Sequence, residues 1–296
     1  MNTARKIFLS VVFLLFSAGF LYAQNREEAL RRDVEFLSDT LCAGRASGTA
    51  GNAAAAFHII MRMKELGYNI DIQSFRIDSV RVGHNIVAFK SANADNLRGI
   101  ADPVKVLTAY YDGLGILNGR LYPGADSNAS GTAALLALAQ RLSGAEKIIF
   151  AFLDGHFADM AGAEVLKKSL SGRKIGILAN IDIIGSTLAP VDKYWKDFMI
   201  ILGAEGERFL LEDCNAGLGI HYYHTYYRSR TFTDLFYRKA GDHRVFVADG
   251  VKTVLFTSGI TSETNKPSDS FDKLDYPVFE RRVEFIARYM LNYGRK

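Results

Sequence analysis

Short apolar runs alternate with amphipathic segments along most of the chain. The apolar runs are typical of strands that are covered on both faces, and they occupy residues 104–109, 148–153, 175–184, 199–202 and 253–256. Residues 70–75 and 85–89 instead alternate like half-buried strands. The amphipathic or alanine-rich segments predict helices over 27–38, 49–66, 129–142, 162–170, 205–214 and 276–293. This alternation predicts a three-layer α/β fold, with a mostly parallel or mixed central sheet and helices on both faces.

The N-terminus has a different character. Arg5 and Lys6 precede an almost unbroken apolar run over 7–16, and small residues then lead to Ala23. This layout is typical of a secretory signal peptide, and the run is at the short end for crossing ~30 Å of hydrocarbon. We therefore expect residues 1–23 to be a cleaved signal peptide and residues 24–296 to form one α/β domain. The expected location is periplasmic or secreted, without membrane attachment after cleavage.

Composition narrows the possible partners. An apolar content of 49% is ample for a packed core and argues against disorder. The formal charge of +4 falls to +2 when Arg5 and Lys6 are removed, and no Lys/Arg-rich run follows, so we expect no nucleic-acid partner. Cys42 and Cys214 permit one disulfide bond in an oxidising compartment, or two free thiols, and the sequence leaves both open.

Polar loops follow several of the predicted strands. Ligand sites of open α/β sheets form in loops at the carboxyl ends of strands. The loops concerned carry the segments AYYDGLG (109–115), PGADSNASG (123–131), DGHF (154–157), NIDIIG (180–185), GDH (241–243) and NKPSDSFDKLD (265–275). A further segment, LCAGRASG (41–48), lies near the start of the domain.

These segments, in this order, resemble the di-zinc aminopeptidases of the bacterial leucyl aminopeptidase and aminopeptidase Y type, the twenty-eighth metallopeptidase family. Glutaminyl cyclases are more distant members of that group. The resemblance implies a zinc-exopeptidase fold in which two zinc ions polarise the scissile carbonyl and activate a bridging water. It also implies a shared carboxylate, one histidine and one further carboxylate for each ion, and a separate glutamate as general base.

Carried over position by position, most of that set is substituted. Tyr110 and Asn265 stand at the two histidine positions, Ser127 at the bridging aspartate, Phe157 at the ligand glutamate and His156 at the general-base glutamate, and Asp182 is the one ligand retained. A hydroxyl or an amide is a poor zinc ligand, and a phenyl ring is none. The remaining polar residues expected to line the cleft are Asp112, Asp126, Asp154, Asp242 and His243.

Three hypotheses follow for function. The first is a pseudo-enzyme that binds a peptide, an amino-terminal group or a partner surface and needs no cofactor. The second is an active zinc aminopeptidase with a rebuilt metal site drawn from Asp112, Asp126, Asp154, His156 and Asp182. The simpler interpretation of His156 is a neutral, hydrogen-bonded imidazole that fills the space of the lost glutamate. The third is a serine nucleophile at Ser127 or Ser130, which is disfavoured because the chain has no Gly-x-Ser-x-Gly and serine is common at helix starts.

The other histidines are expected to lie away from any metal. His58 falls inside an amphipathic helix, and His84 falls at the start of a strand. His221 and His224 would point to opposite faces of a strand. The tyrosines around them, at 222, 223, 226 and 227, form either a lid over the cleft or an edge hairpin.

Overall fold

The computed structural model describes residues 24–90, 97, 100–226 and 228–295. The predicted signal peptide, residues 1–23, therefore lies outside the described residues. Within the described ranges, no helix combines the length and apolar character needed to cross a membrane.

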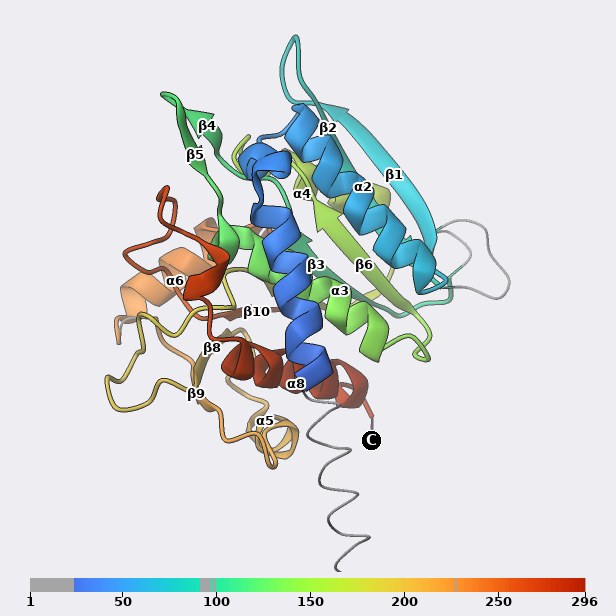
Figure 1. The fold of residues 1–296 in the computed structure, drawn as a ribbon. Helices are drawn as coiled ribbons and strands as arrows, with labels where there is room; N and C mark the ends of the chain where they lie inside the picture. Colours follow the sequence, from blue (N-terminus) through green and yellow to red (C-terminus); the bar gives the residue numbers. More distant parts are fainter. Residues whose placement is uncertain (1–23, 91–96, 98–99, 227, 296) are drawn as a thin grey trace, which may run out of the picture.

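A mixed sheet of eight strands forms the centre of the described chain (Figure 1). In spatial order the strands are β1 (Asn69–Arg76), β2 (Val82–Phe89), β6 (Ile148–Leu153), β3 (Val104–Tyr110), β7 (Ile175–Ile181), β10 (Thr253–Thr257), β8 (Phe198–Leu202) and β9 (His221–Tyr223). The four central strands β6, β3, β7 and β10 are parallel, whereas β2 and β8 join them antiparallel. The predicted fold class is confirmed.

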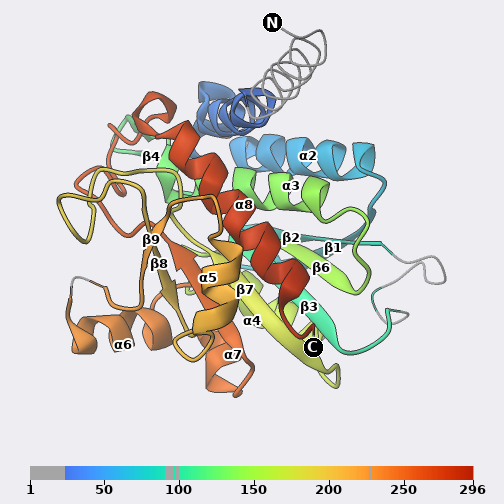
Figure 2. The same ribbon diagram turned by 90° about the horizontal axis from the view of Figure 1, so that it is seen from below.

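Helices cover both faces of this sheet (Figure 2). One face carries the helical residues 24–38 together with α2 (Ala50–Glu65), α3 (Gly131–Arg141), α5 (Arg208–Cys214) and α8 (Tyr276–Asn292). The other carries α4 (Ala161–Ser169), α6 (Arg230–Lys239) and α7 (Arg244–Ala248). Alternate residues of each central strand enter the two cores: Leu107 of β3 packs on the first face, and Val106 packs on the second.

The predicted helix ends agree with local capping chemistry. The Thr49 side chain accepts a hydrogen bond from the Asn52 N–H at 3.3 Å and so begins α2. Gly67, with φ +76°, follows the end of that helix. The Asp275 side chain caps α8, and Pro277 occupies the first turn, where a missing N–H costs nothing.

Some elements differ from the predicted ones. The predicted strand 175–184 ends at Ile181, because the following residues leave the sheet towards the functional end. A small hairpin, β4 (Gly115–Leu117) and β5 (Arg120–Tyr122), interrupts the loop after β3. Cys42 and Cys214 are both buried as free thiols, which decides the question that the sequence left open.

Arg45, in the short helical segment η1 (Thr40–Arg45), ties several loops together from a fully buried position. Its guanidinium donates hydrogen bonds to the carbonyls of Tyr111 and Pro123, both at 2.8 Å, and of Gly124 at 2.9 Å. It also bonds the Leu37 carbonyl at the end of the first helix. The segment LCAGR thus fixes the loops that follow β3, and these loops carry site residues.

Candidate functional site

The site lies at the carboxyl ends of the central parallel strands. Tyr110 is the last residue of β3, His156 and Phe157 follow β6, and Asp182 follows β7. Tyr110 pairs with Leu153 in register, so the ends of β3 and β6 meet at one edge of the sheet. The fold therefore brings together the side chains that the strand-end rule predicts to meet.

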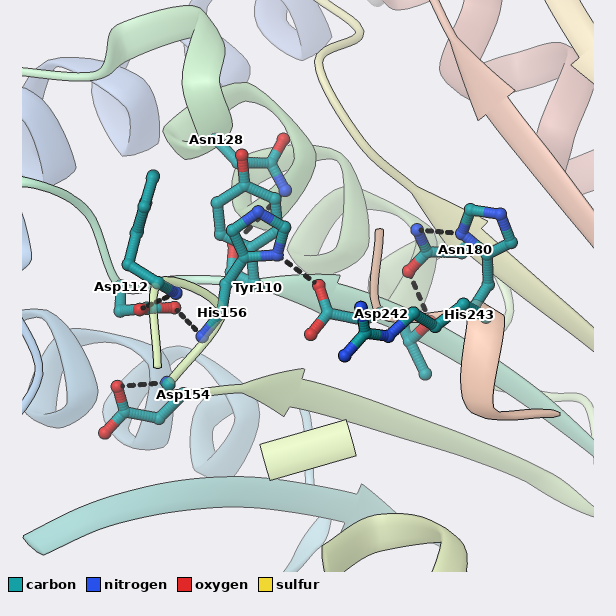
Figure 3. Close-up of polar contacts among 12 residues, drawn as sticks. Tyr110, Asp112, Asn128, Asp154, His156, Asn180, Asp242 and His243 are labelled. Carbon is teal, nitrogen blue, oxygen red and sulfur yellow. Dashed lines mark hydrogen bonds and ion pairs between the residues drawn. The ribbon is translucent and has the colours of Figure 1, made fainter. Parts of the chain in front are cut away.

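Three aromatic rings form the centre of the site. The rings of Tyr110 and His156 stack face to face, with centroids 3.7 Å apart and planes 9° apart (Figure 3). Phe157 meets both rings edge-on, at 6.1 Å from Tyr110 and 5.1 Å from His156. Tyr110 is buried, while Phe157 keeps 41% of its surface exposed. The stack therefore offers an apolar, partly accessible ring to a ligand.

His156 forms an ion pair with Asp242, which comes from the segment between α6 and α7. The His156 Nδ1 lies 2.8 Å from Oδ2 of Asp242, whose side chain is fully buried (Figure 3). Burial disfavours the charged imidazole, but the Asp242 carboxylate outweighs this effect, and the pKa of His156 is raised to about 9. The sequence predicted a neutral, hydrogen-bonded imidazole. The hydrogen bond is present, but the predicted charge state is wrong. The sequence did not indicate the partner, because Asp242 lies 86 residues away in the chain.

Asp112 holds the loop that carries the two rings. Its Oδ1 accepts from the His156 N–H at 3.1 Å, and its Oδ2 accepts from the Phe157 N–H at 3.3 Å and from the Ser47 hydroxyl at 3.1 Å. Burial raises the pKa of Asp112 to about 7, and the negative charge of the nearby Asp154 carboxylate adds to this shift. Asp112 positions the loop backbone, and Ser47, which sequence reasoning did not single out, connects Asp112 with Asp154.

Asp154 has a structural role behind the site. Its carboxylate accepts hydrogen bonds from the Ser47 hydroxyl at 2.6 Å and from the backbone N–H groups of His84 and Gly155 at 2.9 and 2.8 Å. The Asn52 amide at 3.3 Å and the Tyr111 hydroxyl at 3.5 Å are further donors, so the carboxylate is committed to protein groups. Asp154 thus joins β2 and β6 beneath the site and does not face a ligand.

The first residues of α4 pack against this network without space for a side chain. A Cβ at Gly162 would lie 2.2 Å from the Asp154 carbonyl oxygen and 2.3 Å from the Asn85 Oδ1. We expect Gly162→Ala to lower the free energy of unfolding by about 2 kcal/mol, because backbone must shift to admit the methyl group. Urea denaturation measures this loss. The matched substitution Gly144→Ala, at a position open to solvent, should change stability by less than about 0.5 kcal/mol, and equal effects would refute the packing argument.

The segment before α3 supplies the polar edge of the site. The Asp269 carboxylate accepts from the backbone N–H groups of Asp126 and Ser127 at 2.8 and 3.1 Å. This orients the Ser127 hydroxyl, which donates to Asn265 Oδ1 at 3.3 Å and lies 3.4 Å from the Tyr110 hydroxyl. Ser127, Asn265 and Tyr110 therefore form one hydrogen-bonded chain.

Asp126 belongs to the protein interior. Its Oδ1 accepts from the Gly185 N–H at 2.9 Å. Burial, reinforced by Asp269, raises the pKa of Asp126 to about 7. Asp126 was predicted to line the cleft. Its side chain instead binds the backbone of the loop after β7.

Three buried polar atoms near His156 have no hydrogen-bond partner. They are Oδ1 of Asp182, Oδ1 of Asp242 and Nε2 of His243. Burial raises the pKa of Asp182 to about 6, although His156 opposes the shift. His243 accepts from the Asn180 side chain at 3.3 Å, and burial lowers its pKa to about 4, so it is neutral (Figure 3).

Asp182 and Asp242 each keep an uncommitted carboxylate oxygen near His156, and Oδ2 of Asp126 is a further buried oxygen without a partner. In the described part of the chain, however, no group of three or more His, Cys, Asp or Glu side chains is arranged to hold a metal ion.

The remaining histidines lie elsewhere. His58 pairs with Asp33 at 2.9 Å. His221 stacks on Trp195 with centroids 3.9 Å apart, and His224 bonds the Ile201 carbonyl at 2.9 Å. Of the tyrosine cluster, Tyr226 is buried against α6, and residue 227 lies outside the described residues.

A sequence model of peptidase family M28 matches residues 87–290, which is more than half of the chain. The chain belongs to peptidase family M28. No curated protein matches the sequence significantly.

Solved structures agree with the M28 fold. LapB from Legionella pneumophila superposes with a TM-score of 0.71 at 13% identity, covering 91% of this chain and 72% of LapB. BSAP, a zinc aminopeptidase from Bacillus subtilis, gives 0.70 at 12% identity and covers 90% and 95%. Porphyromonas gingivalis glutaminyl cyclase gives 0.67 at 18% identity and covers 91% and 98%. At these identities the similarity shows the shared fold.

Proposed function

We propose that this M28 chain is a non-catalytic member of the family that binds a peptide or a partner protein at the site described. The observation that carries the proposal is the stack of Tyr110 on His156, with the His156 Nδ1 committed to Asp242. Tyr110 stands at a metal-ligand position of the resemblance and His156 at its general-base position, and here the two rings stack on each other while His156 pairs with a carboxylate.

The donor set does not fit a pair of zinc ions. Each zinc would need about four nitrogen, oxygen or sulfur ligands, drawn from carboxylates, neutral imidazoles or thiolates. The site offers Asp182, the neutral imidazole of His243 and the one free oxygen of Asp242, whose other oxygen is paired with His156. The remaining groups are a phenol, a serine hydroxyl, an amide and a phenyl ring. These few donors fall well short of the roughly eight ligands that two zinc ions would need.

The site also lacks a ready general base. A base must accept a proton from water near neutral pH. Because the pKa of His156 is raised to about 9, its imidazole is already protonated there. Asp182, the other candidate, interacts with the Tyr110 side chain and lies near the charged His156.

Binding remains well supported. The accessible Phe157 ring suits an apolar side chain, and the uncommitted oxygens of Asp182 and Asp242 suit a hydrogen-bond donor. Peptide chains offer both kinds of group, and the family acts on peptides.

An assay with a panel of aminoacyl-nitroanilides tests the loss of catalysis. We expect protein lacking residues 1–23, supplied with zinc, to give turnover within the error of a protein-free blank. Turnover that disappears in His156→Ala would instead establish an active, rebuilt site and refute the proposal. Turnover that persists in His156→Ala would refute it as well and would exclude His156 from the chemistry.

A further inference from the structure

Exposed apolar side chains gather at the end of the molecule where the site lies. Of the fourteen large apolar side chains that are exposed in the described chain, nine belong to loops and strand ends at the carboxyl edge of β6, β3 and β7. These nine, here called the site-end surface, are Leu41, Val80, Val82, Ile116, Leu117, Phe157, Leu188, Tyr194 and Trp195. The other five are scattered over α2, β1, α5 and α6. Exposed large apolar side chains that share one end of a molecule are candidates for an interaction surface.

The site-end surface extends well beyond the site itself. It runs from the β1–β2 turn, past Phe157, to the loop between β7 and β8 that carries Trp195. Eight strands at ~4.8 Å spacing span roughly 34 Å. A standard protein interface of ~800 Å² per partner is about 30 Å across. The width of the site-end surface therefore suits a protein partner. A small ligand would contact only the centre of the surface.

Two features project from this surface. The β4–β5 hairpin extends from the sheet beside η1, with Ile116 exposed by 59% and Leu117 next to it (Figure 1). On the other side, Trp195 stacks on His221 and keeps 48% of its surface exposed. Large apolar side chains of this kind, held by a hairpin and by a ring stack, are pre-ordered for docking.

The charges between these side chains are mainly positive. Five exposed basic residues at this end have no ion-pair partner among the described residues: Arg76, Arg120, Lys193, Lys196 and Lys266. Most stand beside apolar members of the surface. Arg76 is opposite Val82 in the β1–β2 register, Arg120 is opposite Leu117, and Lys193 and Lys196 flank Tyr194 and Trp195.

The acidic residues of the same loops are mostly neutralised. Asp78 pairs with Arg81 at 2.7 Å, Asp159 with Arg244 at 2.5 Å, and Asp192 with Arg228 at 3.3 Å, and Glu263 pairs with Lys273. Among the described residues of these loops and of η1, Asp39 and Asp272 are left as exposed carboxylates without an ion-pair partner, against five exposed cations. A complementary partner must therefore be acidic.

We propose that the site-end surface docks an acidic protein partner, whose apolar side chains contact the β4–β5 hairpin and Trp195 and whose carboxylates meet the surrounding cations. The proposal rests on the binding function proposed above and adds the chemical class of the partner. Five cations spread over some 34 Å are too few for a nucleic-acid backbone, whose contacts number about six to ten phosphates.

The test uses random twelve-residue peptides displayed on phage and selected on immobilised protein lacking residues 1–23. We expect selected peptides to be enriched in Asp and Glu together with Leu, Ile, Phe or Trp. Retention of these peptides should fall at least tenfold on Ile116→Asp/Leu117→Asp and on Lys193→Glu/Lys196→Glu. Matched controls are Phe57→Asp/Met61→Asp on α2, and Lys64→Glu/Lys168→Glu on α2 and α4, which should leave retention unchanged. Unaltered melting temperatures establish that each variant is folded.

Each other outcome overturns the proposal. Neutral or basic peptides whose retention depends on Phe157 but not on the hairpin would overturn the acidic docking surface and leave the proposed binding function standing. No enrichment over uncoated wells would overturn both. Co-sedimentation with phosphatidylglycerol vesicles that is lost in the hairpin variant, without peptide enrichment, would assign the surface to an anionic membrane instead.

Discussion

Replacing Arg45 by methionine should lower the free energy of unfolding by about 3–4 kcal/mol. Methionine fills a similar volume but donates no hydrogen bond, so the carbonyls of Leu37, Tyr111, Pro123 and Gly124 lose their buried partner. Each such loss costs on the order of 1 kcal/mol, and more where the carbonyl stays dry. Urea denaturation at neutral pH gives the difference directly.

The matched control for this substitution is Arg208→Met. Arg208 is exposed and pairs with Glu212 one helical turn away, so its loss should cost less than about 0.5 kcal/mol. Arg45→Lys should fall between the two, because one ammonium group cannot reach four carbonyls. A loss below about 1 kcal/mol for Arg45→Met would show that the loops hold together without the guanidinium.

Removing the Asp242 carboxylate should have the second-largest effect, and the effect should depend on pH. The pKa of His156 stands at about 9, against an ordinary value of 6.5, which corresponds to about 3 kcal/mol of stabilisation of the charged form. Because the pKa is raised on folding, this stabilisation is fully present below pH 6.5 and is lost as the pH rises through 9. Asp242→Asn should therefore cost about 3 kcal/mol at pH 6 and far less at pH 10.

Two measurements check this expectation. Urea denaturation at pH 6 and pH 10 gives the stability difference, and a nuclear magnetic resonance titration of the imidazole protons gives the pKa of His156 in both proteins. In Asp242→Asn the pKa of His156 should drop by more than one unit. Asp78→Asn, which removes an exposed partner of Arg81, serves as a control without pH dependence in this range. An equal loss at both pH values would contradict the ion-pair account.

The sheet and most helices follow from the sequence because burial on both faces leaves a strong apolar signal. The run 104–109 became β3, Val104–Tyr110, with a difference of one residue. By contrast, α6 was not among the predicted helices, although Phe232 and Phe236 recur one helical turn apart, because most of its residues are polar and none is completely buried. The β4–β5 hairpin was missed because its strands have only three residues each.

The candidate site was predictable in outline and not in its contacts. Order along the chain and the strand-end rule indicated that the loops bearing Tyr110, His156 and Asp182 would meet, and the fold brings them to one edge. No local pattern links His156 to Asp242, since that pairing depends on how the segment before α7 packs. For the same reason, Asp126 and Asp154 resembled cleft residues, although backbone N–H groups bind their carboxylates inside the protein.

The central claim is that an M28 scaffold here works without its metals, and metal content tests it most directly. Protein lacking residues 1–23 would be purified without chelator, equilibrated with excess zinc, freed of unbound ions and analysed by plasma mass spectrometry. The account predicts well below one zinc ion per chain. Two ions per chain would contradict it outright, and one would contradict it in favour of a rebuilt site around Asp182.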